Sequence, residues 1–168
     1  MTGQGGDVPV QRPLAVFDLD STLADVTHRT HWLEGPWKDY GSFFADAVHD
    51  GLLADGAALV REAERTCEVG YVTGRPEWCR RDTLAWLQAH DLPLGPLRMR
   101  PNGDHRPART TKVELLRDLV EGRVLAIVVD DDVEVCRAYA RQGWPVLHAT
   151  WAARSDALLQ AQEDEGRT

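Results

Sequence analysis

The feature that most constrains the fold is a six-residue apolar run that ends in three acids. The run Val124–Val129 (VLAIVV) is continuous and rich in β-branched residues, and Asp130-Asp131-Asp132 follow it directly. A run without polar alternation is typical of a strand that is buried on both faces of a parallel sheet. Ligands bind at the carboxyl ends of the strands in such sheets, so these acids are predicted to lie at a binding edge.

Four further runs are interpreted as strands, and helical stretches separate them. The strand candidates are LAVF at Leu14–Phe17, VGYV at Val69–Val72, LRMR at Leu97–Arg100 and PVLH at Pro145–His148. The helical candidates are Gly56–Arg65 with Asp55 as a cap, Pro76–His90, Thr111–Val120, Val133–Gln142 and Trp151–Gln162. This alternation predicts an α/β fold, a doubly wound parallel sheet of about five strands with right-handed crossovers.

The chain of 168 residues suits one domain. We expect a flexible tail at residues 1–12, which are polar and Gly-rich, and a single domain at 13–168. One stretch, at about 25–55, interrupts the alternation: it is rich in aromatic residues and contains no convincing strand. We interpret it as a small helical insertion after the first strand, helical around Tyr40–Val48.

Composition excludes several classes of function. The net charge of −8 argues against an extended nucleic-acid footprint, although it leaves room for a nucleotide or a short strand end in a local basic pocket. No apolar run approaches the length of a membrane span, so no membrane partner is expected. The three cysteines are far apart and fit free thiols in a reducing cytoplasm. The sequence leaves the oligomeric state open.

Acidic residues follow two of the predicted strands. Asp18 and Asp20 come after the first strand, and Asp130 and Asp131 come after the strongest one. If these strands are neighbours, the carboxylates crowd one site and repel each other unless a cation lies between them. Mg²⁺ suits such oxygen ligands, so Asp18, Asp20, Asp130 and Asp131 are its predicted ligands.

The other strand ends and helix starts supply groups that bind anions. Thr73-Gly74-Arg75 offer a hydroxyl, backbone amides and a guanidinium, and Lys112 opens a predicted helix. Carboxylates with a metal on one side and an anion pocket on the other describe a phosphoryl-transfer site. Asp18 is the predicted nucleophile, which forms an aspartyl-phosphate, and Asp20 is the predicted acid and base.

These pieces resemble the four motifs of the haloacid dehalogenase superfamily, in the same order. The first resembles DxDxT, with Asp18, Asp20 and Thr22; the second is Thr73 with Gly74-Arg75; the third is Lys112; and the fourth is Asp130-Asp131. The resemblance covers roughly residues 14–151. It implies a Rossmann-like core and a Mg²⁺-dependent phosphatase in which Thr73 and Lys112 are catalytic.

Within that superfamily the chain is similar to the 3′-phosphatase domain of bacteriophage polynucleotide kinase. The segments FDLDSTL, VTGR, MRPNGDHRPARTTK and VDD carry the similarity. It implies that Arg29 and Arg75 touch the substrate phosphate or its leaving group, and that Gly74 and Thr22 also serve binding. Three positions depart from the pattern: Ser21 stands where glycine is common, Ala108 where an acid is expected, and Asp132 where an arginine is expected.

Several alternatives stay open. The substrate is a nucleotide or polynucleotide 3′-phosphate or, alternatively, a small metabolite phosphate. The reaction is hydrolysis or, alternatively, transfer to a second hydroxyl, and a non-catalytic metal- or phosphate-binding module is the third reading.

Some residues have a plain structural reading beside the functional one. For Asp132 we favour a helix N-cap or solvated role over a metal ligand. His28 and His31 are three apart but lack a third ligand, so a structural role is favoured. Trp32, Trp37 and Phe43 either stack a base or form the core of the insertion, and we favour the core.

Overall fold

The computed structural model describes residues 11–168, so most of the predicted tail at 1–12 lies outside the described residues. Within 11–168, five strands form one parallel sheet in the order β5-β4-β1-β6-β7. The strands are β1 (Leu14–Phe17), β4 (Glu68–Pro76), β5 (Leu97–Arg100), β6 (Leu125–Asp130) and β7 (Val146–His148). The predicted α/β class is confirmed. The first strand lies in the centre of the sheet and pairs with the strongest one, so the condition for crowding the acids at one site is met.

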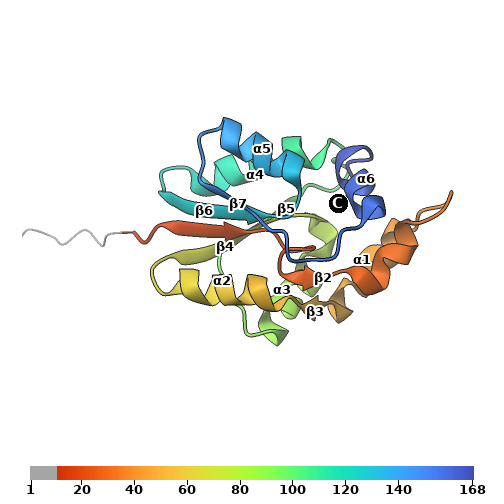
Figure 1. Cartoon of the computed structure of the whole chain (residues 1–168), viewed down its shortest axis with the longest axis horizontal. Coiled ribbons are helices and arrows are strands. Elements are labelled where there is room, and N and C mark those ends of the chain that lie inside the picture. Colours follow the sequence, from red (N-terminus) through yellow and green to blue (C-terminus); the bar gives the residue numbers. More distant parts are fainter. Residues whose placement is uncertain (1–10) are drawn as a thin grey trace, which may run out of the picture.

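Helices cover both faces of the sheet. In Figure 1, α4 (Ala108–Val120) and α5 (Val133–Arg141) lie on one side, and α2 (Ala54–Glu64) and α3 (Arg80–Ala89) lie on the other. Successive residues of β1 point to opposite faces. Ala15 and Phe17 join one buried cluster, and Leu14 and Val16 join the other. Because both faces of β1 are buried, its sequence is a continuous run of apolar residues.

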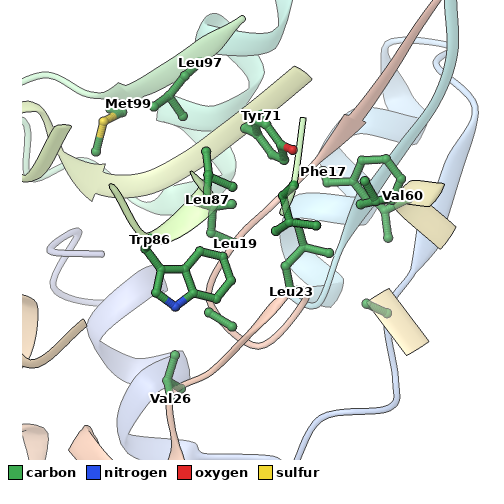
Figure 2. Close-up of a cluster of buried hydrophobic side chains, with 14 of the residues drawn as sticks. Phe17, Leu19, Leu23, Val26, Val60, Tyr71, Trp86, Leu87, Leu97 and Met99 are labelled. Carbon is green, nitrogen blue, oxygen red and sulfur yellow. The ribbon is translucent and has the colours of Figure 1, made fainter. Parts of the chain in front are cut away.

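The larger of the two cores lies between the sheet and α2 and α3. Figure 2 shows Phe17, Leu19 and Leu23 of the first strand and its following loop packed near Tyr71 and Trp86. The loop that carries the first motif is therefore held by the core itself.

Several predicted boundaries shift. Leu53, not Asp55, occupies the N-cap position of α2, without a side-chain cap, and Asp55 lies in the first turn of the helix. A 3-10 turn, η3 (Glu77–Cys79), precedes α3, so that helix begins later than expected. The terminal helix α6 (Asp156–Glu163) begins only after its N-cap Ser155. No helix between residues 11 and 168 combines the length and apolar character that crossing a membrane requires.

The insertion is mostly helical, as predicted, but the absence of strands was wrong. It contains η1 (Thr27–Leu33), α1 (Tyr40–Ala45) and η2 (Asp46–His49). Two short antiparallel strands, β2 (Ala24–Asp25) and β3 (Gly51–Leu52), close its base. Each strand has two residues, which is too short to produce a readable alternation of apolar and polar residues.

Gly56 allows α2 to pack directly against the first motif. A β-carbon built on Gly56 would lie 2.2 Å from the backbone oxygen of Thr22. That distance is far below van der Waals contact, and the atom it meets belongs to the main chain, so any side chain would force the helix and the motif loop apart.

We predict that Gly56→Ala destabilises the protein by about 1 to 3 kcal/mol, as overpacking does. Alanine favours helices by up to about 1 kcal/mol over glycine, so propensity alone predicts the opposite sign. Urea unfolding measures the change. Gly41→Ala in α1 is the matched control, since a β-carbon there meets its nearest neighbour, Asp39, at 3.4 Å. Equal effects at the two positions would contradict the packing argument.

Candidate active site

Three carboxylates gather where β1 and β6 end. Asp18 follows β1 directly, Asp130 is the last residue of β6, and Asp131 comes next. The backbone N–H of Asp18 donates to the carbonyl of Val129 at 2.9 Å, which fixes the two strand ends side by side. Oxygens of Asp18, Asp130 and Asp131 all lie within 4.8 Å of one another. The structure therefore brings together three of the four predicted metal ligands.

Lys112 lies inside this group of acids. Its Nζ is 3.0 Å from Asp18 Oδ1 and donates to Asp130 Oδ2 at 2.8 Å. The side chain is buried, and α4 positions it one turn in from the helix start. Burial would lower its pKa, but the charges of Asp130 and Asp18 outweigh burial and raise it well above its ordinary value. Lys112 therefore stays charged and holds two carboxylates in place.

One lysine does not neutralise three acids. Burial raises the pKa of Asp131, and the neighbouring charges of Asp18 and Asp130 raise it further. Burial likewise raises the pKa of Asp18, and it raises the pKa of Asp130 to about 8. The charge of Lys112 opposes both shifts without cancelling them. A divalent cation would relieve this repulsion.

The free oxygens fit such a cation. In the described chain, Asp18 Oδ2 and Asp131 Oδ1 are buried and have no hydrogen-bond partner. Both oxygens of Asp130 are occupied instead, Oδ2 by Lys112 and Oδ1 by the backbone N–H of Asp132. The residues present therefore fit a magnesium site at Asp18 and Asp131, where the free Oδ1 of Asp131 is left to the ion.

Asp20 lies outside this cluster, in a second buried network. Its Oδ1 accepts from Arg29 Nη2 at 2.9 Å and from Arg75 Nε and Nη2 at 2.8 and 2.6 Å. Burial alone would raise its pKa, but the two guanidiniums outweigh burial and hold the pKa at about 2. The structure does not bring the Asp20 carboxylate to the other three, and its role as a metal ligand stays a prediction.

Arg29 and Arg75 are both buried and share a further carboxylate that the sequence did not single out, Asp50. Asp50 closes the insertion, 32 residues after Asp18. No motif spacing marks it, because its partners Arg29 and Arg75 belong to separate elements that only the folded chain brings together. Contact of Arg29 and Arg75 with substrate stays a prediction.

The second motif lies at the end of β4. Thr73 Oγ1 accepts from the backbone N–H of Arg75 at 3.2 Å, which leaves its hydroxyl proton free to donate. Thr22 is buried, and within residues 11–168 its hydroxyl has no partner. A β-carbon on Gly74 would lie 2.1 Å from the carbonyl carbon of Thr168, so this glycine permits the close approach of the last described residues.

This arrangement matches a known family. The polynucleotide kinase PNKP phosphatase domain, of haloacid dehalogenase type, matches residues 13–152, which is most of the chain. The chain belongs to this family. It is therefore a phosphatase of the haloacid dehalogenase class, as the motifs implied. No curated protein matches the chain.

Solved structures agree on the fold. A chain of a Pnkp1/Rnl/Hen1 RNA repair complex superposes with a TM-score of 0.71 at 22% identity over 91% of this chain. A haloacid dehalogenase-like hydrolase from Streptococcus pneumoniae gives 0.58 at 18% over 91%, and covers 92% of that chain. A class C acid phosphatase from Bacillus anthracis gives 0.59 at 13% over 80%, and 63% of that chain. The present chain spans 48% of the RNA repair chain.

The three positions that depart from the PNKP-like pattern lie in well-defined local settings. Ser21 has a φ of 63°, a left-handed conformation that glycine adopts without steric strain. Asp132 is the N-cap of α5 and accepts from the backbone N–H of Glu134 at 2.8 Å, so the N-cap reading is confirmed. Ala108 is the buried first residue of α4.

The C-terminal segment packs against the insertion and the second motif. Helix α6 contacts η1 of the insertion. Lys38 Nζ donates to Gln160 at 3.2 Å, and Arg100 Nη2 donates to the carbonyl of Thr168 at 3.0 Å. Asp18 itself is only 3% exposed.

Two hollows border residues of the motifs or their neighbours. One, of about 350 Å³, is lined by Ser21 and Asp131 together with residues of 148–159, among them the basic side chains of His148 and Arg154. The other, of about 140 Å³, has aromatic walls from Tyr40, Phe44 and Trp78. The first hollow borders Asp131, and the second borders Pro76, the residue after Arg75.

The insertion's histidines and most of its aromatics have structural contacts. His28 Nε2 lies 2.9 Å from Asp50 Oδ1, and His31 Nδ1 lies 3.0 Å from the backbone oxygen of His28. Trp32 packs against the core and Phe43 is buried in it, as the structural reading favours. Trp37 differs, since it is 90% exposed.

We predict that Mg²⁺ stabilises the wild-type protein and that Asp131→Asn abolishes most of that gain. Binding at about 100 times the dissociation constant adds about 2.7 kcal/mol, because the ion binds only the folded cluster. Without Mg²⁺ the variant should be at least as stable as the wild type, since one buried like charge is removed. Thermal unfolding with and without Mg²⁺ measures both effects. Asp118→Asn, an exposed acid of α4, is the control; a full Mg²⁺ shift in Asp131→Asn would contradict the site.

Proposed function

We propose that this PNKP-like domain is a Mg²⁺-dependent phosphomonoesterase in which Asp18 forms an aspartyl-phosphate. One observation carries the proposal. Lys112 holds Asp18 through Oδ1, while in the described residues Oδ2 of the same carboxylate has no hydrogen-bond partner. A carboxylate that is fixed through one oxygen and free at the other suits attack on phosphorus.

In the first half of the reaction, Asp18 Oδ2 forms a bond to phosphorus and the bond from phosphorus to the leaving oxygen breaks. The Thr73 hydroxyl donates to a phosphoryl oxygen, and the charge of Lys112 offsets the charge on the nucleophile. Asp20 gives a proton to the leaving oxygen. Its Oδ2 suits this step because that oxygen has no partner between residues 11 and 168, whereas Oδ1 is occupied by the arginines.

In the second half, water attacks phosphorus, Asp20 Oδ2 takes a proton from it, and the bond to Asp18 breaks. The resting pKa of about 2 suits this step, since Asp20 begins it ionised. The first step needs the protonated form. A substrate phosphate beside Asp20 favours that form, because its negative charge raises the pKa of the carboxyl and competes for Arg29 and Arg75.

Magnesium would be held by Asp18 and Asp131, with Asp130 orienting Lys112 beside them. When bound, the ion neutralises phosphoryl charge and repulsion among the carboxylates. Asp130 is kept in place without the ion, through Lys112 and the backbone of Asp132.

For the substrate we propose a nucleotide or polynucleotide 3′-phosphate end. Membership of the PNKP phosphatase family supports this, and so does the aromatic hollow beside the second motif, which suits a base. A small metabolite phosphate is the second candidate. The burial of Asp18 supports it, because a small ester reaches a buried carboxylate more easily than a polymer end does. We place the reaction in the cytoplasm, since Cys67, Cys79 and Cys136 are all free thiols.

We predict that Asp18→Asn lowers turnover of a chromogenic phosphate ester by roughly three orders of magnitude or more, because the amide is not a nucleophile. Folding should survive, since asparagine keeps the shape and removes a buried like charge. A steady-state assay with Mg²⁺ measures the loss, and Asp118→Asn is the control. If Asp18→Asn turned over the ester as fast as the wild type does, the covalent mechanism would be contradicted. If the wild-type protein itself had no turnover, a non-catalytic module would be favoured.

We predict that 3′-phosphorylated oligonucleotides are hydrolysed with a kcat/KM at least about tenfold above that of sugar phosphates, a difference of about 1.4 kcal/mol in transition-state binding. The comparison is made at one fixed salt concentration, because phosphate contacts are salt-dependent. Released phosphate is measured together with any phosphorylated alcohol that is added as acceptor. Equal rates for both classes would remove the nucleic-acid candidate, and transfer to the alcohol would favour a phosphotransferase.

A further inference from the structure

Asp50 binds both of the arginines that surround Asp20. Its two oxygens accept from Arg29 Nε and Nη2, both at 2.7 Å, which is a bidentate pair. Its Oδ2 also accepts from Arg75 Nη2 at 2.9 Å. All three side chains are buried, so these charge-assisted bonds are little screened by water.

The charges of this network balance. Arg29 and Arg75 face Asp20 and Asp50, two buried cations against two buried anions. The partly exposed His28 ring also lies 2.9 Å from Asp50 Oδ1, at the edge of the network. If Asp20 were the only acid, two buried guanidiniums would share one carboxylate and one charge would stay uncompensated. Asp50 supplies the missing charge, and it is not one of the motif residues.

The backbone of Asp50 is also held in place. It joins η2 to β3 in the insertion, and its backbone oxygen accepts from Trp86 Nε1 of α3 at 2.8 Å. Arg29 belongs to η1 of the insertion, whereas Arg75 belongs to β4 of the core. One carboxylate thus ties the insertion to the sheet at the point where both arginines approach the first motif.

The two arginines hold Asp50 and Asp20 differently. Arg29 gives Asp50 two bonds and Asp20 one, and Arg75 gives Asp20 two bonds through a single oxygen. A substrate phosphate that replaces Asp20 as their partner would therefore leave both guanidiniums still attached to Asp50.

We propose that Asp50 is a positioning residue for the phosphatase reaction: it holds Arg29 and Arg75 in place, so that they can exchange the Asp20 carboxylate for the substrate phosphate or its leaving group. The inference rests on the proposed function. Asp50 does not touch substrate, and it acts through the two arginines.

Asp50→Glu tests position separately from charge. Glutamate keeps the negative charge and adds one methylene, and a displacement of about 1 Å in a positioning group can cost about a hundredfold in rate. We expect kcat/KM to fall by about ten- to a hundredfold while thermal stability changes little. Asp46→Asn is the matched control, because Asp46 accepts from Trp32 Nε1 within the same insertion and lies outside the network. Full activity in Asp50→Glu would overturn the proposal.

A double-mutant cycle shows whether Asp50 acts through Arg29. Asp50→Asn, Arg29→Gln and the double variant are compared, and the double variant restores the charge balance, which favours folding. We expect its loss in kcat/KM to fall well short of the product of the two single losses. Losses that multiply would mean that Asp50 works independently of Arg29, which contradicts the proposal.

A readout without turnover separates this inference from the proposed function. The Nε–H signals of Arg29 and Arg75 in ¹⁵N-labelled protein, assigned with Arg29→Gln and Arg75→Gln, should exchange slowly in the wild type and in Asp46→Asn. In Asp50→Asn the Arg29 Nε–H should exchange fast, because Asp50 Oδ1 is its acceptor, whereas the Arg75 Nε–H, which donates to Asp20, should change less. Unchanged signals in Asp50→Asn would overturn the positioning role. A wild type inactive on every phosphate ester would instead overturn the proposed function, and the exchange rates would still decide whether Asp50 orders the arginines.

Discussion

The rest of the site depends on the crowding of Asp18, Asp130 and Asp131 around Lys112. Parallel pairing of β1 with β6 brings their strand ends together, and it leaves three buried acids facing one lysine. This arrangement is electrostatically incomplete: burial raises the pKa of each acid, and repulsion by neighbouring carboxylates, Asp20 in the case of Asp18, raises it further. A divalent cation would complete it, and it fits beside the buried Oδ1 of Asp131, which lacks a partner in the described chain.

A second charged network surrounds Asp20, two residues after Asp18 on the same loop. It shifts the pKa of its carboxyl in the opposite direction. The pKa of Asp18 is raised by burial, whereas that of Asp20 is held at about 2 because Arg29 and Arg75 outweigh burial. Neighbouring carboxyls whose environments push their pKa values apart are suited to different roles. In the proposed reaction, the environment of Asp18 leaves one oxygen free for attack, and the environment of Asp20 keeps its carboxylate ionised and able to accept a proton.

The sequence was enough for the fold and for most of the first network. The apolar run before Asp130 and the acids after two strands placed that cluster correctly, because parallel strands bring their carboxyl ends to one edge. Strands β2 and β3 were missed because two residues give no periodicity. Asp50 was missed because its partners come from η1 and β4, so that only the folded chain reveals the pairing. The separation of Asp20 from the metal cluster could not be predicted either, since DxDxT spacing does not say which way each carboxylate points.

The most direct test of the account is to trap the phosphoryl group on the protein. The enzyme is mixed with a ³²P-labelled phosphate ester and Mg²⁺, quenched in acid within one turnover, and digested for mass spectrometry. We predict label on the peptide that contains Asp18, stable in acid and released by hydroxylamine, as an acyl phosphate is. Single-turnover release of phosphate with no labelled peptide at any time, or with label on another residue, would contradict the assignment of Asp18 as nucleophile.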